Sequence, residues 1–332
     1  MNYHIKTNPE DFFVREIIGL KFDDLGEFSY YNLKKTNLST QEAVDIISKK
    51  LHITKKFVNY AGTKDKKAVT EQNISIKGGP EKDFDFGNVK LKFLGRGKKR
   101  LNLGDNSGNY FEIIVRNIEK RPKKISCFVN YFDDQRFSGK NAETGRAIVR
   151  KDFEKAAEII LENDKSYGKI IQDYLERNKK DFIGALRLVD RKILRMFVHA
   201  YQSYLWNLCV SKTFEGKKCR KTRYSLGELN VPEEKTKNFS YPIAGFGTEK
   251  EDKILREVLQ KEKISKRDFV IKEIPELSSE GSERSVFAEL KNLKFGNLEE
   301  DELNKGKKKI KISFELGKGS YATMAVKQMF SS

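Results

Sequence analysis

The sequence predicts an α+β protein in which a sheet formed by both ends of the chain is interrupted by a largely helical insertion. Strand-type alternation dominates the first part of the chain, helical spacing dominates residues 152–212, and alternation returns at 308–316. A tandem arrangement is the alternative, but the strand-rich C-terminal tail is too short to fold convincingly by itself. We therefore expect one domain from residues 1–142 and 286–332, and an inserted domain from 143–285.

The N-terminal part contains five segments that we predict to be strands. In chain order they are 12–18, 28–34, 69–76, 89–93 and 110–115. Ser39 and Thr40 precede a predicted helix over Gln41–Lys50, with Thr40 as the candidate cap. The basic segment G-R-G-K-K-R-L-N-L-G (95–104) lacks the Lys-Ser/Thr ending of a P-loop. It predicts a basic hairpin that contacts phosphate, with a solvated turn as the alternative.

The middle of the chain is predicted to be helical. The expected helices are 152–162, 169–178, 181–188, 190–212 and 249–260. The longest is amphipathic, since Leu194, Phe197 and Tyr201 fall on one face. We expect a basic loop at 217–223 and a polar loop at 233–238. A strand at 308–316 and a helix at 321–330 complete the chain.

Composition favours a partner that carries negative charge. Lysine and arginine number 66 against 48 acidic residues, which gives a formal charge of +18 over 332 residues. Such an excess fits nucleic acid or an anionic membrane surface. Aromatic residues interleaved with cations, such as Tyr131 and Phe132 near Arg136, suit stacking with RNA bases, although most aromatics are expected in the core.

Other classes of protein are disfavoured. The three cysteines form no CxxC pair, and the three histidines are far apart, so neither a disulfide framework nor a metal site is predicted. No run has the length of a membrane span, and the polar start of the chain does not resemble a signal peptide. We expect a cytoplasmic protein without a metal or cofactor. We also expect a monomer, since no apolar surface stripe requires a partner.

One loop carries the strongest chemical signal. Residues 62–70, G-T-K-D-K-K-A-V-T, place Asp65 in a tight turn among three lysines, directly before a predicted strand. A carboxylate beside cations is expected to be ionised at neutral pH. Asp65 is therefore a candidate nucleophile toward an electrophilic carbon of a polyanionic substrate. By itself, a solvated turn residue is the commoner interpretation.

Several motifs, in this order, resemble those of the TruD family of pseudouridine synthases. They are K-T-N-P-E-D-F-F-V-R-E (6–16), A-G-T-K-D-K-K-A-V-T-E-Q (61–72), K-K-R-L-N-L-G-D-N-S-G-N-Y-F (98–111), N-Y-F-D-D-Q-R-F (130–137), H-A-Y-Q-S-Y-L-W-N (199–207) and G-S-Y-A-T-M-A-V (319–326). They span nearly the whole chain, and their joint order is far more specific than any one of them.

The resemblance implies a pseudouridine-synthase catalytic domain, with a mixed, largely antiparallel sheet and flanking helices. That domain is split by an inserted, mainly helical α/β TRUD domain. The implied reaction isomerises a uridine within RNA, usually tRNA, to pseudouridine: the C1′–N1 bond breaks and a C1′–C5 bond forms, with no cofactor or metal. The expected target is uridine 13 of the tRNA D-arm, with position 35 of a tyrosine tRNA as the alternative.

The resemblance also assigns roles to residues. Asp65 matches the catalytic aspartate and would attack C1′ or C6, or abstract a proton from C2′; the sequence leaves these routes open. Phe132 matches the ring that packs against the flipped-out base, with a core position as the alternative. Lys6 would pair with Asp65 or with a phosphate.

Three further residues are candidates for substrate binding. Lys64 would steer phosphate, Asn130 would hydrogen-bond backbone or base, and Arg136 would anchor phosphate or brace the loop. Asp133 and Ser138 depart from the family pattern, where glycine is usual, so the local backbone and the substrate preference are open. The alternative function is a non-catalytic RNA-binding protein or tRNA chaperone on the same fold. A metal-dependent nuclease is disfavoured because no ligand cluster is evident.

Overall fold

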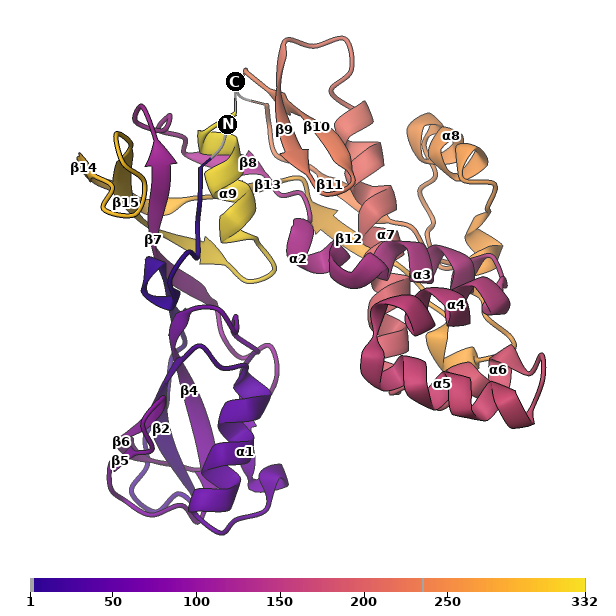
Figure 1. Cartoon of the computed structure of the whole chain (residues 1–332). Helices are drawn as coiled ribbons and strands as arrows, with labels where there is room; N and C mark the ends of the chain where they lie inside the picture. The colour runs from indigo at the N-terminus through magenta and orange to yellow at the C-terminus, as the bar shows by residue number, and fades with distance from the viewer. Residues whose placement is uncertain (1–2, 235, 332) are drawn as a thin grey trace. The chain divides into compact units, whose positions relative to one another are not determined.

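The computed structural model describes residues 3–234 and 236–331 (Figure 1). The chain divides into two compact units. Unit 1 comprises Met1–Cys127 and Glu289–Ala322, and unit 2 comprises Phe128–Ala288 and Thr323–Ser332. Each unit is therefore built from two separate stretches of chain. The domain boundaries at 142/143 and 285/286 stay a prediction from the sequence.

Unit 1 contains one large sheet, with nine strands in the described residues. The strands are β1 (Phe12–Ile17), β2 (Phe28–Thr36), β3 (Val58–Tyr60), β4 (Val69–Lys77), β5 (Phe84–Asp85), β6 (Val89–Gly97), β7 (Gly108–Ile118), β14 (Lys291–Glu300) and β15 (Lys308–Gly317). Their order is β14-β15-β7-β1-β4-β2-β6-β5, with β3 paired to β4. The β1–β4 pair is parallel and the other described pairs of this sheet are antiparallel. The prediction of a mixed, largely antiparallel sheet is confirmed.

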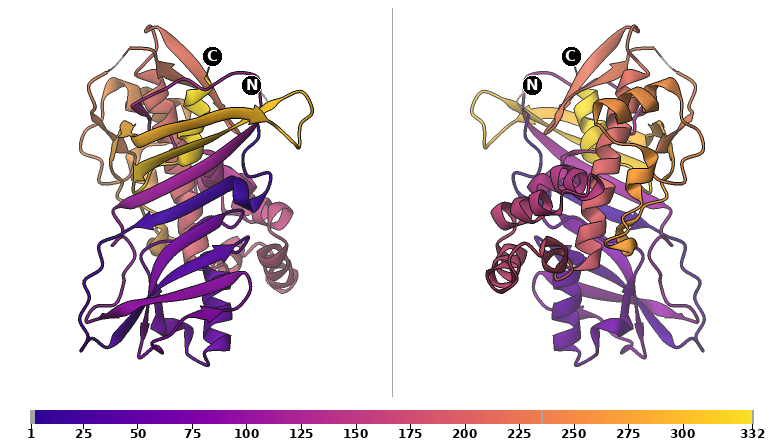
Figure 2. Two further views of the ribbon diagram at one scale, coloured as in Figure 1. Left: turned by 90° about the vertical axis from the view of Figure 1, so that its left-hand side faces the viewer. Right: turned by 90° about the vertical axis from the view of Figure 1, so that its right-hand side faces the viewer.

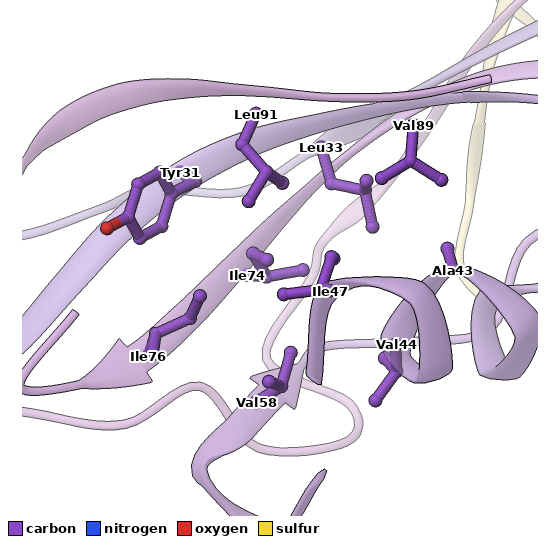
Figure 3. Close-up of a cluster of buried hydrophobic side chains, with 10 residues drawn as sticks. All are labelled: Tyr31, Leu33, Ala43, Val44, Ile47, Val58, Ile74, Ile76, Val89 and Leu91. Carbon is purple, nitrogen blue, oxygen red and sulfur yellow. The ribbon is translucent and has the colours of Figure 1, made fainter. Parts of the chain in front are cut away.

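The sheet joins the two ends of the chain. β15 pairs with β7 along its length, so the yellow-orange C-terminal strands run beside the purple N-terminal ones in Figure 2. Helix α1 (Thr40–Lys50) covers the part of the sheet formed by β2, β3, β4 and β6. The inner face of α1 packs against alternate residues of these strands (Figure 3). On β2 those inward residues include Tyr31 and Leu33, both fully buried. This packing fixes the register of the strands beneath α1.

The cap of α1 differs from the one expected. Ser39, not Thr40, is the N-cap: its hydroxyl accepts from the Glu42 N–H, and the Glu42 carboxylate accepts from the Ser39 N–H at 2.7 Å. Thr40 is the first helical residue and is buried, and its hydroxyl bonds other groups described below.

The basic segment 95–104 is not the hairpin that the sequence predicts, and its first three residues are the end of β6. β6 and β7 are separated in the sheet by β2, β4 and β1, so the segment that joins them passes across the strand ends. The Gly104 N–H donates to the Ala61 carbonyl at 2.8 Å, which ties this crossing to the start of the Asp65 loop. The two strands of a hairpin must be neighbours in the sheet, and the spacing of charged residues in the sequence does not indicate which strands are neighbours.

Unit 2 is built around one long helix. Its helices are α2 (Asp134–Phe137), α3 (Asn141–Val149), α4 (Phe153–Asn163), α5 (Lys165–Arg177), α6 (Phe182–Leu186), α7 (Arg191–Lys212) and α8 (Lys253–Lys261), with most of α9 (Ala322–Met329). α3 packs closely on α7: a Cβ at Gly145 would lie 1.9 Å from the Phe197 carbonyl oxygen, so only glycine fits there. The predicted long amphipathic helix is therefore the centre of this unit.

The strands of unit 2 are short and form two-stranded sheets. β9 (Cys219–Tyr224) pairs with β10 (Gly227–Pro232), and β11 (Ser240–Ile243) pairs with β12 (Ser282–Ser285); β8 (Cys127–Val129) pairs with β13 (Phe287–Glu289). The basic loop expected at 217–223 is thus wrong, because most of it is β9. Thr222 and Tyr224 are buried while Lys221 and Arg223 are exposed, so the charges obscure the alternation.

Among the described residues, no helix has both the length and the apolar character needed to cross a membrane.

Candidate active site

The Asp65 carboxylate lies in an ion pair. Lys6 Nζ is 2.9 Å from Asp65 Oδ2, and the two side chains are 21% and 20% exposed. The same ammonium lies 4.0 Å from the centroid of the Phe12 ring. Lys6 also has a left-handed backbone with φ of 57°, which a residue with a side chain adopts at a cost. The chain thus holds Lys6 in an unfavourable conformation that brings its ammonium to Asp65.

A buried lysine of β2 holds the main chain of the Asp65 loop. Lys35, on β2, is fully buried, and its ammonium donates to the Asp65 carbonyl at 2.8 Å and to the Leu38 carbonyl at 2.6 Å. A longer contact of 3.5 Å reaches the Lys64 carbonyl. The loop is therefore attached to the strand and to the turn that precedes α1.

Two polar side chains hold the start of the same loop. The Lys64 N–H donates to the Thr40 hydroxyl at 2.9 Å, and that hydroxyl donates to Gln72 Oε1 at 3.0 Å. The Gln72 amide in turn donates to the Gly62 carbonyl at 3.0 Å. Thr40 and Gln72 are both buried, so this chain of bonds is shielded from water and holds the loop in one conformation.

The side chain of Lys64 is buried in a second ion pair. Its Nζ lies 2.5 Å from Glu16 Oε1, with the side chains 5% and 0% exposed. The other Glu16 oxygen accepts from the Asn73 N–H at 3.0 Å. These contacts orient the Lys64 ammonium into the protein, where it supports the loop; its contact with substrate phosphate stays a prediction.

The second group of predicted residues lies in unit 2, around Asn130. Its N–H donates to the Val286 carbonyl at 2.7 Å, and its carbonyl accepts from Arg284 Nε at 3.1 Å and Nη2 at 2.8 Å. Asn130 is 6% exposed, and its side-chain oxygen is buried without a hydrogen-bond partner in the described structure. A buried acceptor without a partner is uncommon and is consistent with a ligand-binding role.

Phe132 lies in a cluster of aromatic and cationic groups. The residue is 4% exposed, and its ring meets the Trp206 ring edge-on, at 5.6 Å between centroids. The Arg284 guanidinium lies 4.1 Å from the ring centroid and that of Arg136 lies 5.4 Å from it. Asn207 of α7 bonds both the Phe132 N–H and its carbonyl at 2.9 Å. Helix α7 therefore positions the backbone at Phe132.

Arg136 is on the short helix α2. Besides its contact with the Phe132 ring, its Nε is buried without a hydrogen-bond acceptor in the described structure. The geometry brings Phe132 and Arg136 into contact, as it does Lys6 and Asp65. Binding of substrate by Arg136 stays a prediction.

The departures from the family pattern have local explanations. Asp133, only 1% exposed, caps α2 and lies 2.6 Å from the Lys327 ammonium, which also contacts Asp134 at 2.5 Å. The Ser138 hydroxyl donates to the Gln135 carbonyl at 3.2 Å. Both side chains therefore stabilise the ends of α2.

Sequence reasoning missed Lys35, Arg284 and the roles of Glu16 and Asn207. A signal existed for two of them. Lys35 follows Tyr31 and Leu33 at two-residue intervals, and Glu16 likewise follows Phe12 and Val14. Because alternate residues of a strand point to the same face, each charged residue lies on the buried face of its strand. Nothing in its local sequence distinguishes Arg284. In the described residues, no group of three or more His, Cys, Asp or Glu side chains is arranged to hold a metal ion.

The structure has a mixed, mainly antiparallel sheet, and a lysine-rich loop of this sheet carries an ion-paired aspartate. Both features agree with the class of protein expected from the sequence, a pseudouridine synthase. A family model for tRNA pseudouridine synthase D (TruD) matches residues 1–169, 160–240 and 230–329. The chain belongs to this family. The prediction of an isomerase of the pseudouridine-synthase class is thereby confirmed.

Individual relatives match over nearly their full extent. The chain is 36% identical to the "Probable tRNA pseudouridine synthase D 2" of Methanocaldococcus jannaschii, over 98% of this chain and 91% of that protein. It is 33% identical to the tRNA pseudouridine synthase D of Aquifex aeolicus, over 100% and 99%. A crystal structure described as a putative tRNA pseudouridine synthase D (TruD) of Methanosarcina mazei superposes with a TM-score of 0.72 at 28% identity, over 98% and 92% of the chains.

Proposed function

We propose that this chain isomerises a specific uridine in tRNA to pseudouridine, with Asp65 as the catalytic residue. The observation that carries the proposal is the ion pair of Asp65 with Lys6, at 2.9 Å, on a loop whose backbone is fixed by buried groups. A catalytic group held in one position needs little reorganisation in the transition state. Family membership supports the reaction and the class of RNA.

The chemistry requires one bond exchange. The C1′–N1 bond of the uridine breaks, the uracil turns over while it stays bound, and a bond forms between C1′ and C5; the proton on C5 is released and N1 gains one. The Asp65 carboxylate would act as a nucleophile at C1′ or C6, or as a base toward the C2′ proton. Lys6 would hold the carboxylate in the orientation that any of these routes needs.

The other candidates would bind the flipped-out nucleotide and its phosphates. We propose that Asn130, whose buried side-chain oxygen has no hydrogen-bond partner among the described residues, accepts from the base or a neighbouring group. Phe132 would pack against the uracil, and Arg136 would contact phosphate. Lys64 would act mainly through Glu16, by supporting the loop. Residues 1–142 and 286–332 would form the catalytic domain and 143–285 the inserted one.

We further propose uridine 13 as the target, a monomeric enzyme and a cytoplasmic location, where tRNA is modified. The formal charge of +18 supports binding to a large RNA surface. The reaction as written needs no cofactor, because every electron pair and proton comes from the substrate, Asp65 and water.

The test uses unmodified tRNA transcripts and maps pseudouridine by carbodiimide-blocked primer extension. Wild-type protein is compared with Asp65→Asn and with Asp45→Asn, a matched change at a half-exposed carboxylate of α1 that is paired with Lys55. We expect one stop, at position 13, with wild type and Asp45→Asn, and none with Asp65→Asn, while tRNA affinity stays within about threefold in all three. Product from Asp65→Asn would refute the assignment of Asp65. Tight tRNA binding without product from wild type would favour the chaperone alternative.

A further inference from the structure

Lys35 occupies a position in which a charged side chain is costly. It is fully buried on β2 and follows Tyr31 and Leu33 on the face that packs beneath α1 (Figure 3 shows those two side chains). Its neighbour Lys34 points to the other side, with its side chain 49% exposed and 3.5 Å from Glu71. Lysine is rarely buried completely unless its ammonium group is satisfied. The burial of Lys35 therefore requires an explanation.

The explanation lies in its acceptors. An ammonium group has three protons, and Lys35 directs them to the carbonyls of Leu38 at 2.6 Å, Asp65 at 2.8 Å and Lys64 at 3.5 Å. All three acceptors are neutral, so the buried charge is hydrogen-bonded but lies against no carboxylate in these contacts. Burial accordingly lowers the pKa of Lys35 to about 8, although the charge of Asp65 opposes that shift. An apolar residue here would avoid this cost.

We infer that Lys35 is a positioning residue for the isomerisation, which fixes the main chain of Asp65 so that its carboxylate is presented in the reactive orientation. Two lysines then act on one aspartate, since Lys6 contacts the carboxylate and Lys35 contacts the main-chain carbonyl of the same residue. The inference rests on the proposed role of Asp65. It assigns Lys35 no contact with RNA, because its side chain is fully buried.

A displaced loop would slow the chemical step and leave binding almost unchanged. Misplacing a reacting group by about 1 Å can cost ~100-fold in rate. Most of the basic surface that would bind the RNA stays intact when one buried amine is removed. Loss of the Lys35 ammonium should therefore separate rate from affinity, whereas a purely structural role would either change nothing or unfold the protein.

The experiment measures single-turnover pseudouridine formation at saturating enzyme, together with the dissociation constant for tRNA by filter binding. The variants are Lys35→Met, which removes the donor, and Lys35→Gln, which keeps a neutral donor on a side chain one atom shorter. Lys34→Met is the matched control, since it removes the adjacent lysine on the opposite face of β2. Circular dichroism establishes which variants are folded, and hydrogen exchange of residues 62–68 reports the order of the loop.

We expect Lys35→Met to react ~100-fold more slowly, Lys35→Gln roughly tenfold more slowly and Lys34→Met within about twofold of wild type, with tRNA affinity within about threefold throughout. Amides 62–68 should exchange faster in both Lys35 variants. If Lys35→Met does not fold, the reaction rate and tRNA affinity of Lys35→Gln test the inference. A folded Lys35 variant that reacts within threefold of wild type, or one that loses tRNA affinity, would overturn the inference. Failure of the proposed function itself is distinguishable, because wild type would then make no product.

Discussion

Lys64 Nζ lies 2.5 Å from Glu16 Oε1, and both side chains are shielded from solvent. The pair connects the Asp65 loop to β1, a central strand of the sheet, and the second Glu16 oxygen bonds the Asn73 N–H of β4. Burial makes such a pair dependent on both members, because either charge alone would remain without compensation.

Removal of one member should therefore destabilise unit 1 strongly. We expect Glu16→Leu or Lys64→Met alone to lower the free energy of unfolding by about 3–5 kcal/mol, and the double variant to lose less than the sum of the two. Urea denaturation measures all three. If the double variant instead loses the sum of the two single losses, the two residues are not coupled. The same set of single and double variants at the exposed pair Lys77–Glu27 is the control, with an expected coupling energy of about 0–1 kcal/mol.

Lys6→Met should impair catalysis more than folding. The variant removes the ammonium from Asp65 and from the Phe12 ring, so the ion pair between Lys6 and the carboxylate is lost. We expect the single-turnover rate of pseudouridine formation to fall roughly tenfold to 100-fold, with little change in melting temperature. Lys21→Met, at an exposed lysine of the same unit, controls for the loss of one positive charge. Equal rates for the two variants would argue against a role for Lys6.

Arg284→Lys should not behave as a conservative substitution. The guanidinium covers the Phe132 ring and donates two hydrogen bonds to the Asn130 carbonyl, and an ammonium cannot reproduce this planar arrangement. We expect a loss of about 1–3 kcal/mol in stability and a slower reaction. Arg223→Lys is the control, since its side chain is 84% exposed. Thermal unfolding and single-turnover rates that match the control would contradict the importance of this contact.

Stability should depend on pH through Lys35. Burial lowers its pKa to about 8 from the ordinary 10.5, and the neighbouring charges of Asp65, Lys64 and Glu42 act on the same group. Between these two pKa values the unfolded chain binds more protons at Lys35 than the folded chain does. The Lys35 contribution to the free energy of unfolding therefore rises as pH increases from about 8 to about 10.

Comparison with Lys35→Met isolates this contribution. Urea denaturation at pH 7, 8, 9 and 10 should show wild type gaining stability relative to the variant across the upper part of the range. A difference that is constant or shrinks with rising pH would show that folding does not lower the pKa of Lys35.

Much of the fold could be predicted because periodicity reports burial directly. The predicted strands at 12–18, 28–34 and 308–316 correspond to β1, β2 and β15, and the predicted helix at 190–212 corresponds to α7. β14 was missed because it lies at the edge of the sheet, where most of its side chains are exposed. Irregularities in its register also interrupt the spacing of its apolar residues, Leu293, Phe295 and Leu298. Periodicity also carries no information about which strands are neighbours, and the incorrect hairpin at 95–104 follows from that.

The candidate site likewise has residues that could be predicted from the sequence and residues that could not. The loop that carries Asp65 and its lysines could be recognised because charge and the break before a strand are local properties, although residues 62–65 are irregular and do not form the predicted tight turn. The acceptors of Lys35 could not, because they come from a turn and a loop that follow it in the chain, and only the folded sheet brings them to one point. Lys64 illustrates the limit: its sequence suggests a surface cation, while its position against Glu16 makes it part of the interior.

The pairing of β15 with β7 has a consequence for how the protein is made. About 190 residues separate the end of β7 at Ile118 from the start of β15 at Lys308, and they include nearly all of unit 2. A ribosome that adds ~5–20 residues per second needs roughly 10–40 s to cover that distance. During this interval β7 presents an unpaired edge, of the kind that recruits other strands into aggregates. The first part of unit 1 is synthesised before unit 2 and its last strands come after most of unit 2, so we expect the growing chain to need protection of this strand edge until translation is nearly complete.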